Sequence, residues 1–385
     1  MKTTNTAPHD SVTTHPHDGA IFISLEMGRA NWLVTALLPG SEKMSRHEVP
    51  GGDAAELFAL TARLKGKVAK RTGPDIPVIA IQEAGTDGFW LHRMMLKEGI
   101  ESYVVDATSI AVARKFRRTK TDAVDGMVLL RTLLAYKRGE PRVCSMVVTP
   151  SVEEEDRRRL SRERRNLVRE RIRHSNRIKG FLIGHGIRGF NPLRLDRYER
   201  LEELRMPNGG ELPPRIKTEI KRELDRLELV QRQIKDVCKE RDSFMSAEAP
   251  ASPAKTLVAL KGIGEEIAAT LWMEGLYRRF DNRRQLASYA GLAPSPWQSG
   301  DMQREQGISK SGNPRLRTCM VELCWLWLRH QPDSAVSKWF QERVRGDSGR
   351  IRRVMICALA RKLLIALWRY VSTGELPEGA KLKAA

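Results

Sequence analysis

A charge-dense segment in the middle of the chain limits the possible folds most strongly. Residues 149–182, TPSVEEEDRRRLSRERRNLVRERIRHSNRIKGFL, contain one glycine and one proline, and the proline lies at the very start. This composition predicts a single long helix that begins after Pro150. The only apolar positions at helical spacing form a thin seam: Leu160, Leu167, Ile172 and Ile178.

A second segment has the same character. Residues 213–241 space Ile220, Leu224, Leu227, Ile234 and Val237 in the manner of a coiled coil. The intervening PNGGELPP, residues 207–214, is typical of a turn. We therefore expect two long helices, either folded back as an antiparallel hairpin or paired with another protomer.

The chain before these helices has a different pattern. Two apolar runs, residues 20–26 and 31–38, predict a β-hairpin, and the continuous β-branched run at 76–83 predicts a buried central strand. Helical spacing at 51–71 and 88–99, a strand at 101–106 and a helix beginning near Thr121 complete an alternation of strands and helices. Residues 20 to about 145 thus predict a layered α/β domain with a mixed sheet.

The chain after the long helices predicts a third, mostly helical part. It follows a linker at 246–255 and begins with TLVALKGIGEEIAATLW. Within this stretch, Gly262-Ile263-Gly264 resembles the turn of a helix-hairpin-helix motif that grips a DNA phosphate. A glycine pair that ends a helix gives the same string. Residues 286–320 predict a long functional loop, and Trp325 and Trp327 are expected in the core.

Charge and length indicate the kind of partner. The 385 residues suggest two or three domains, and the formal net charge of +20 would attract a polyanion. The most apolar run, residues 354–368, is too short to span a membrane and contains Arg361 and Lys362. We therefore expect nucleic acid and no membrane.

Five scattered cysteines without a CxxC pair, and no apolar signal segment, predict a reducing cytoplasm and no zinc site.

The first long helix carries more arginines than its acidic residues balance. A solvated helix face accounts for about half of them. The surplus suits a phosphate backbone. The arginines are Arg157, Arg158, Arg159, Arg164, Arg165, Arg169, Arg171 and Arg173.

An acidic pair lies directly after the most basic stretch of the α/β part. In KFRRTKTDAVDG, residues 115–126, Asp122 and Asp125 are three positions apart, about 4.5 Å along a helix axis and on one face. They could cap a helix and occupy its first turn, or they could share a cation. Taken alone, the pair does not decide between these roles.

Two further carboxylates end predicted strands. Glu26 follows the first apolar run and Glu83 the central one, whereas Asp87 and Asp106 are better explained as caps or turn residues. Phosphoryl chemistry with two metal ions requires carboxylates that converge from separate elements on ions about 3.5 to 4 Å apart. Glu26, Glu83, Asp122 and Asp125 are therefore the candidate set.

These residues, in this order, resemble the DEDD insertion-sequence transposases of the IS110 family. The resemblance rests on SLEMG, IQEAG and KTDAVD, followed by LKGIG, LASYAGLAP, QSG and GISKSGNPRLR. It covers residues 20–345 and implies an N-terminal RuvC-like domain with an RNase H fold and a C-terminal transposase domain. The family is known for recombination guided by a bridge RNA.

The resemblance also implies roles for individual residues. Glu26, Glu83, Asp122 and Asp125 would hold Mg²⁺, as two ions for which Mn²⁺ could substitute, although the family usually has Asp where this chain has Glu26. Ser299 in WQSGD would attack a DNA phosphate and form a transient phosphoseryl link, with Ser309 and then Ser311 as the next candidates.

A larger set of residues is predicted to contact the nucleic acid. It comprises Lys115, Arg117, Arg118, Lys120, Gly262, Gly264, Arg304, Lys310, Arg315 and Arg317.

The sequence therefore predicts an α/β plus α architecture in five parts. These are a disordered arm (1–19), a RuvC-like domain (20–148), a helical coiled-coil region (149–245), a transposase domain with the serine loop (246–345), and a C-terminal helix and tail (346–385). The expected function is a bacterial, cytoplasmic, nucleoid-associated transposase that acts on donor and target DNA with a guide RNA. It is expected to form a dimer or tetramer through the helical region.

Two alternatives remain open at this point. One is a metal-dependent nuclease or Holliday-junction resolvase without covalent serine chemistry, and the other is a nucleic-acid-binding protein without catalysis. A covalent protein–DNA adduct would separate the transposase from the resolvase, and metal-dependent cleavage would separate the resolvase from the binding protein.

Overall fold

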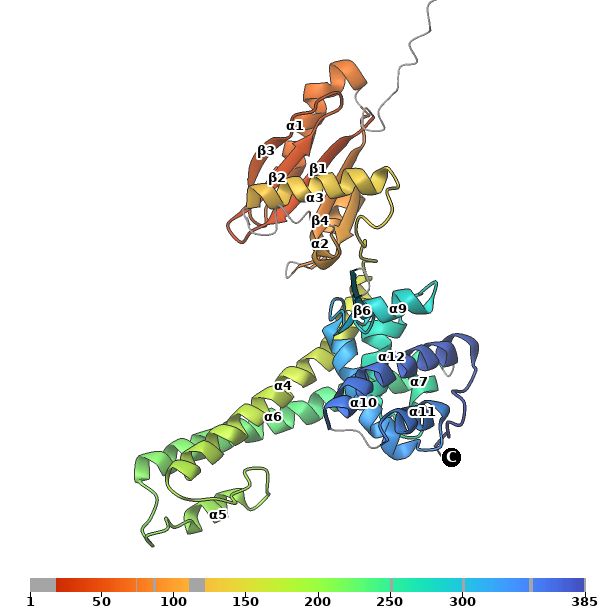
Figure 1. Cartoon of the computed structure of the whole chain (residues 1–385). Helices are drawn as coiled ribbons and strands as arrows, with labels where there is room; N and C mark the ends of the chain where they lie inside the picture. Colours follow the sequence, from red (N-terminus) through yellow and green to blue (C-terminus); the bar gives the residue numbers. More distant parts are fainter. Residues whose placement is uncertain are drawn as a thin grey trace, which may run out of the picture. The chain divides into compact units, whose positions relative to one another are not determined.

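A computed structural model describes residues 19–73, 75–85, 88–110, 122–249, 252–299, 302–345 and 349–383. The chain divides into two compact units, residues 1–150 and 151–385. Figure 1 shows the first unit in red to yellow and the second in yellow-green to blue. Apart from Gly19, the predicted N-terminal arm lies outside the described residues, and the finer division into five parts stays a prediction.

The first unit is built on a mixed five-stranded sheet in the order β3-β2-β1-β4-β5. The strands are β1 (Ile21–Met27), β2 (Asn31–Leu37), β3 (Ser45–Pro50), β4 (Val78–Glu83) and β5 (Glu101–Val105). β1, β2 and β3 pair antiparallel, whereas β4 pairs parallel with both β1 and β5. The predicted hairpin, the buried central strand and the mixed α/β character are confirmed.

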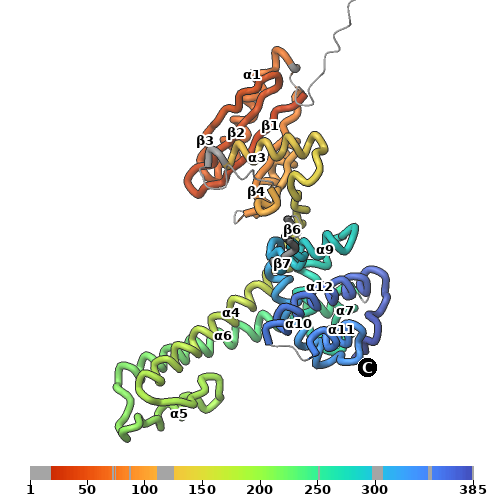
Figure 2. Tube along the Cα trace, viewed as in Figure 1, coloured from red at the N-terminus to blue at the C-terminus, as the bar shows by residue number. Residues whose placement is uncertain are grey.

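Helices cover both faces of this sheet (Figures 1 and 2). α1 (Ala54–Thr72) and α2 (Trp90–Lys97) pack on the face that carries Ile23 and Leu25, whereas α3 (Asp122–Lys137) packs on the face that carries Phe22 and Ile81. A short turn, η1 (Ala107–Ser109), follows β5. The alternation of side chains along a strand separates the two cores.

The sequence did not predict β3. This strand lies at the edge of the sheet, and only Val49 among its six residues is buried. Its sequence, SRHEVP, therefore lacks the apolar run by which strands are recognised. Polar residues on an edge strand also discourage pairing with other chains.

A helical arm opens the second unit (Figure 1). α4 (Val152–Gly184) begins with a capping box between Ser151 and Glu154. α6 (Pro214–Ala247) packs along α4, and the short α5 (Arg197–Glu203) lies in the chain segment that connects these two helices. Arg164 contacts Cys238, and farther along α4 His174 contacts Glu223, so the two helices are antiparallel within one chain.

The body of the second unit is mostly helical and surrounds one large apolar core. Trp327 is fully buried in this core, as expected, but Trp325 is 41% exposed, so its predicted core position is wrong. The elements are α7 (Pro253–Val258), α8 (Glu265–Leu271), a π-helical turn η3 (Trp272–Leu276), α9 (Arg283–Tyr289), β6 (Pro294–Ser299), β7 (Met302–Ile308), α10 (Pro314–His330), α11 (Ala335–Arg343) and α12 (Gly349–Thr373).

The long loop predicted at 286–320 is wrong. Residues 294–308 form an antiparallel hairpin of β6 and β7, in which Ser299 pairs with Met302. The sequence of β6, PSPWQS, contains two prolines and no apolar alternation, which concealed the strand.

Among the described residues, no helix has both the length and the apolar character needed to cross a membrane.

Candidate functional site

Two of the predicted metal ligands end neighbouring parallel strands. The β1–β4 register pairs Leu25 with Gln82, so the next residues, Glu26 and Glu83, lie level with each other. Side chains alternate along a strand, and Ser24 and Ile81 face α3, which places Glu26 and Glu83 on that same face. Both side chains are half-buried.

A close approach between α3 and the sheet brings a third acidic residue to this edge. The Ser24 hydroxyl donates a 2.7 Å hydrogen bond to the carbonyl oxygen of Gly126, and a Cβ added at Gly126 would lie 2.7 Å from the Thr35 Oγ1. Only a glycine allows the helix to come this near. Asp125 immediately precedes Gly126 and is half-buried.

The backbone thus places Glu26 and Glu83 at the carboxyl ends of two central strands and Asp125 at the start of α3, on the same face, with Asp122 one helical turn before Asp125. Asp122 belongs to α3, but its side chain lies outside the described set. Within the described side chains, no group of three His, Cys, Asp or Glu is close enough to hold a metal ion. The four-ligand site therefore stays a prediction.

The kind of ligand at this edge suits a hard divalent cation. The four candidates are all carboxylates, and oxygen ligands are those that Mg²⁺ and Ca²⁺ take in proteins. The close contact of Gly126 with Ser24 and Thr35 fixes the start of α3 against β1 and β2. Ligands that come from three separate elements require such a rigid support.

The basic residues predicted beside these carboxylates cannot be placed. Lys115, Arg117, Arg118 and Lys120 lie in 111–121, outside the described residues.

The predicted helix-hairpin-helix turn has the expected local form. Gly262 has a φ of 91° and Gly264 caps α8, so the turn joins α7 to α8. Ile263 between them is fully buried. Whether this turn binds a phosphate stays a prediction.

The three candidate nucleophiles lie at different points of the β6–β7 region. Ser299 is the last residue of β6, next to the tip of the hairpin, and its side chain is outside the described set, as is that of Arg304. Ser309 and Ser311 follow β7 at the base of the hairpin. Ser309 is exposed, and its backbone N–H donates to the Ala293 carbonyl oxygen at 2.8 Å.

Three of the residues predicted to contact the nucleic acid, Arg317, Lys310 and Arg315, differ in their surroundings within the protein. The Arg317 guanidinium donates to the carbonyl oxygens of Ala290 and Ser311 at 3.4 Å each, which makes it part of the turn. Lys310 is exposed, with a left-handed φ of 58°. Burial and the nearby charge of Arg162 lower the pKa of Arg315, as do Arg165 and Arg169. Positive charges of α4 therefore act on Arg315 at the start of α10.

Some of the arginine surplus on α4 is internal. The Arg157 guanidinium lies 5.5 Å from the Phe244 ring centroid, Arg158 is buried 4.3 Å from that of Tyr277, and Arg164 pairs with Glu266 at 3.3 Å. These residues join the arm to the helical body. Arg158 is buried and Arg164 is paired, whereas Arg157 remains exposed.

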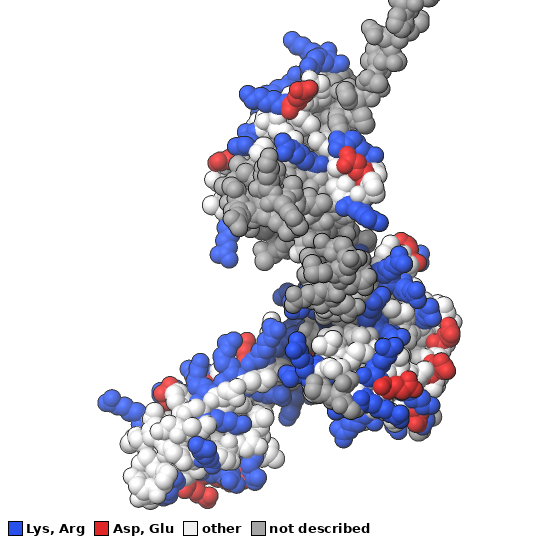
Figure 3. Space-filling model, in the orientation of Figure 1, with Lys and Arg blue, Asp and Glu red and all other residues white. Residues whose placement is uncertain are grey.

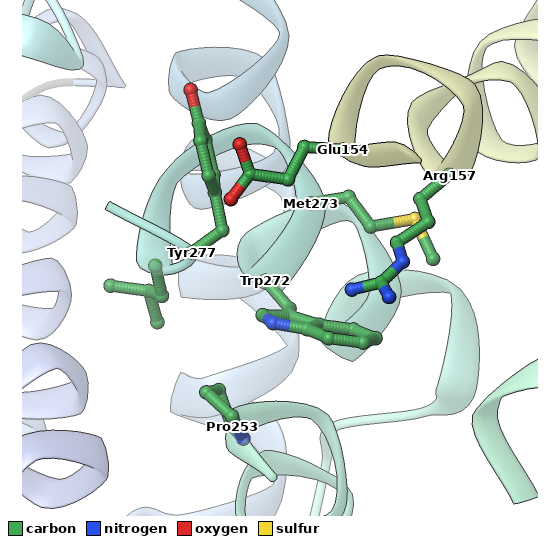
Figure 4. Close-up of a pocket in the computed structure, with 7 residues that line it drawn as sticks. Glu154, Arg157, Pro253, Trp272, Met273 and Tyr277 are labelled. Carbon is green, nitrogen blue, oxygen red and sulfur yellow. The ribbon is translucent and has the colours of Figure 1, made fainter. Parts of the chain in front are cut away.

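A pocket of about 320 Å³ lies between the start of α4 and η3. Figure 4 shows Glu154 and Arg157 on one side of it, facing Trp272 and Pro253. Both polar groups are engaged, because Glu154 accepts from the Ser151 N–H at 2.8 Å and Arg157 stacks against Trp272 at 5.9 Å.

The sequence reasoning missed a buried polar network in the second unit. Glu274 of η3 is 1% exposed and accepts two hydrogen bonds from Arg162 of α4, at 2.8 and 3.0 Å. Its burial opposes ionisation, but the bonds from Arg162 and Asn313 hold its pKa below the ordinary value. The one available signal was a lone acid in the apolar run TLWMEGLY.

The exposed surface is strongly basic. Over the face drawn in Figure 3, Lys and Arg side chains are spread along the α4–α6 arm and the helical body, with Asp and Glu in smaller groups. This distribution agrees with the net charge of +20.

Comparison with known proteins identifies the class. A family model for DEDD transposases of the IS110 type, described as "Transposase", matches residues 35–186, and the model "Transposase IS116/IS110/IS902 family" matches residues 254–338. Glu83, Asp122 and Asp125 lie in the first match, which begins after Glu26. The three candidate serines lie in the second.

Relatives match along most of the chain. The protein "Putative transposase y4rJ" of Sinorhizobium fredii is 57% identical in an alignment of 378 positions that covers 95% of each chain. "Transposase for insertion sequence element IS1111A" of Coxiella burnetii is 25% identical, over 77% of this chain and 78% of its own. "Transposase for insertion sequence element IS1328" of Yersinia enterocolitica is 26% identical, over 60% and 67%.

The class is thus that of insertion-sequence transposases, enzymes that act on DNA. The chain belongs to the IS110 family of these transposases, with a metal-dependent DEDD domain in its first half.

Proposed function

We propose that this transposase cuts DNA strands at a four-carboxylate site formed by Glu26, Glu83, Asp122 and Asp125. One observation supports the proposal above all. Glu26 and Glu83 lie level with each other on the sheet face that α3 covers, and Gly126 allows the start of α3 to pack closely against that face. The four residues would hold Mg²⁺. When bound, the divalent ions activate the attacking oxygen and stabilise the leaving oxygen.

The same proposal assigns an RNase H-like, RuvC-like fold to the first unit. Its support is the sheet order β3-β2-β1-β4-β5, with an antiparallel half and a parallel half and helices on both faces. Glu26 and Glu83 occupy the carboxyl ends of β1 and β4, where ligand sites of open α/β sheets form.

In the second unit, Ser299 would act as the nucleophile. Its Oγ forms a bond to a DNA phosphorus, its proton is transferred to a base, and the bond from phosphorus to one sugar oxygen breaks. The released sugar oxygen takes up a proton and becomes a hydroxyl. A hydroxyl of another strand end then attacks the phosphoseryl link and restores Ser299.

A serine hydroxyl needs nearby cations to hold the phosphate during this attack. The positive charge that Arg165 and Arg169 of α4 exert on Arg315 supports this role for the second unit. Arg304 belongs to β7 of the hairpin and Lys310 follows that strand. Both would add positive charge to hold the phosphate.

A bridge RNA encoded by the element would select the DNA, and assembly through the α4–α6 arm would bring protomers together. The basic surface and the likeness to the family support these two proposals. The protein would then act on the nucleoid in the cytoplasm.

The decisive experiment uses the full-length protein, expressed with its element so that bound RNA is retained. We expect Ser299→Ala to abolish the covalent protein–DNA adduct in a denaturing gel. Persistence of the adduct would transfer the role to Ser309, and Ser309→Ala tests that directly. Metal-dependent cleavage without any adduct would support the alternative, a RuvC-like nuclease. Sequencing the bound nucleic acid tests the guide RNA.

A further inference from the structure

Glu274 lies in the core of the second unit, among apolar side chains. A buried carboxylate is costly unless hydrogen bonds and an opposite charge compensate for the lost water. Arg162 of α4 supplies both, through Nε and Nη2. The arm is thereby tied to η3 at one point.

The same carboxylate contacts the helix that follows the candidate serines. Asn313 Nδ2 lies 3.0 Å from Glu274 Oε2 and 3.0 Å from the Glu274 carbonyl oxygen. The Tyr289 hydroxyl donates to that carbonyl oxygen at 2.9 Å. Carbonyl groups near a helix end lack partners within the helix, and these side chains supply them.

Asn313 has a second task at the same time. It caps α10, because its Oδ1 accepts from the backbone N–H groups of Arg315 and Leu316 at 2.9 and 3.1 Å. Its own backbone N–H donates to the Tyr289 carbonyl oxygen at 2.6 Å. One side chain thus joins η3, the end of α9 and the start of α10.

The base of the β6–β7 hairpin is fixed to this junction. Lys310 N–H donates to the Gly291 carbonyl oxygen at 3.2 Å. A Cβ added at Gly291 would overlap the Ser311 carbonyl oxygen, and one added at Gly312 would overlap that of Tyr289. Both strands start or end within a few residues of this contact, so its geometry sets the direction of the hairpin.

We propose that Glu274 is a positioning residue: with Arg162 and Asn313 it orients the serine-bearing hairpin relative to the α4 arm. The inference rests on the proposed function, because it gives the hairpin a catalytic purpose. Glu274 itself contacts no DNA. A shift of the arm would be transmitted through Arg162 to the base of the hairpin, and reactions of this kind lose rate steeply when the nucleophile is misplaced.

Asn313→Ser separates the two tasks of Asn313. Serine caps a helix as well as asparagine does, but it cannot reach Glu274 in the same way. We expect a small fall in the melting temperature, because the buried Glu274 loses a hydrogen-bond donor, unchanged DNA affinity, and a single-turnover cleavage rate per folded molecule about ten- to a hundredfold lower. The matched control is Asn282→Ser, since Asn282 caps α9 through Arg284 and Gln285 N–H groups and is exposed.

A second pair of variants tests the hydrogen bond itself. Glu274→Gln and Asn313→Asp should each lower the cleavage rate per folded molecule, because Gln offers Arg162 one acceptor oxygen in place of two, and an ionised Asp cannot donate to Glu274. A merely structural contact would move the melting temperature and leave the rate per folded molecule unchanged.

The outcomes separate the two proposals. Equal cleavage rates for Asn313→Ser and Asn282→Ser would overturn the positioning role, and so would a wild-type rate per folded molecule in Glu274→Gln. Cleavage by the wild type without a serine adduct would instead overturn the serine step of the proposed function.

Discussion

The acidic residues of the two units differ in their surroundings. In the first unit, Glu26, Glu83 and Asp125 are half-buried at the ends of separate elements, on one face of a sheet. In the second, Glu274 is enclosed in the core and saturated by Arg162 and Asn313. The first arrangement is the one proposed to bind a metal ion, whereas the second holds parts of the protein together.

This contrast predicts opposite effects of removing a carboxylate. Glu274→Leu leaves Arg162 without its partner and should cost about 3 kcal/mol, at the lower end for buried pairs because Arg162 is 31% exposed. The free energy of unfolding in urea measures this. Combining it with Arg162→Met should recover most of the loss; a double variant as unstable as the single one would contradict the assignment.

Removing a carboxylate from the first unit should affect activity instead. Glu83→Gln should lower metal-dependent strand cleavage more than about a hundredfold, beyond what outer-shell partners of a metal cost. Its melting temperature should not fall, because the change also removes repulsion among the carboxylates. Cleavage of labelled element-end DNA measures the rate.

Glu48→Gln is the matched control for this change, because Glu48 is exposed on the edge strand β3. Full cleavage activity in Glu83→Gln would remove Glu83 from the site. Glu26 precedes the part of the chain that the family model matches. Glu26→Gln, tested in the same assay, decides whether Glu26 also contributes to metal-dependent cleavage.

The close approach of α3 provides a third test. Gly126→Ala should cost about 1–3 kcal/mol, because the added Cβ would lie 2.7 Å from Thr35 Oγ1 and push the helix away from the carboxylates. Gly180→Ala in α4 meets open space and should stabilise by about 0.5–1 kcal/mol. Thermal unfolding compares them, and equal shifts would refute the packing argument.

The smallest expected effect is on the pH dependence of the stability of the α4–α6 arm. Burial opposes ionisation of Glu223, but hydrogen bonds from His174 and Arg177 outweigh it and hold its pKa below the ordinary 4.5. This stability is present above pH 4.5 and is lost as the pH falls through the lower folded pKa. The free energy of unfolding, followed by the circular dichroism of the helices at a series of pH values, should show this loss.

Glu223→Gln is the comparison for that measurement. It should flatten the acid limb of the stability profile, while an unchanged acid limb would mean that other carboxylates set it.

The sequence predicted the elements of the first unit well because their patterns are local. The β-branched run of β4 and the helical spacing of α1 are each readable from a few residues. β3 and β6 were missed because polar residues and prolines replace the apolar alternation at these positions.

The candidate site could be predicted in part for the same reason. Glu26, Glu83 and Asp125 stand at the ends of readable elements. Glu274 could not be assigned, since its partners Arg162 and Asn313 are 112 and 39 residues away in the chain. Such a network exists only in the folded protein.

The π-helical turn of η3 has a consequence for how this sequence can vary. A π turn accommodates an extra residue in a helix, and such turns are often found at functional sites. Deleting one residue from 272–276 would restore α-helical phase and rotate the preceding or following side chains by about 100°. Chains with the shorter helix would need a different residue to face Arg162, so the length of this segment should vary together with positions 162 and 313.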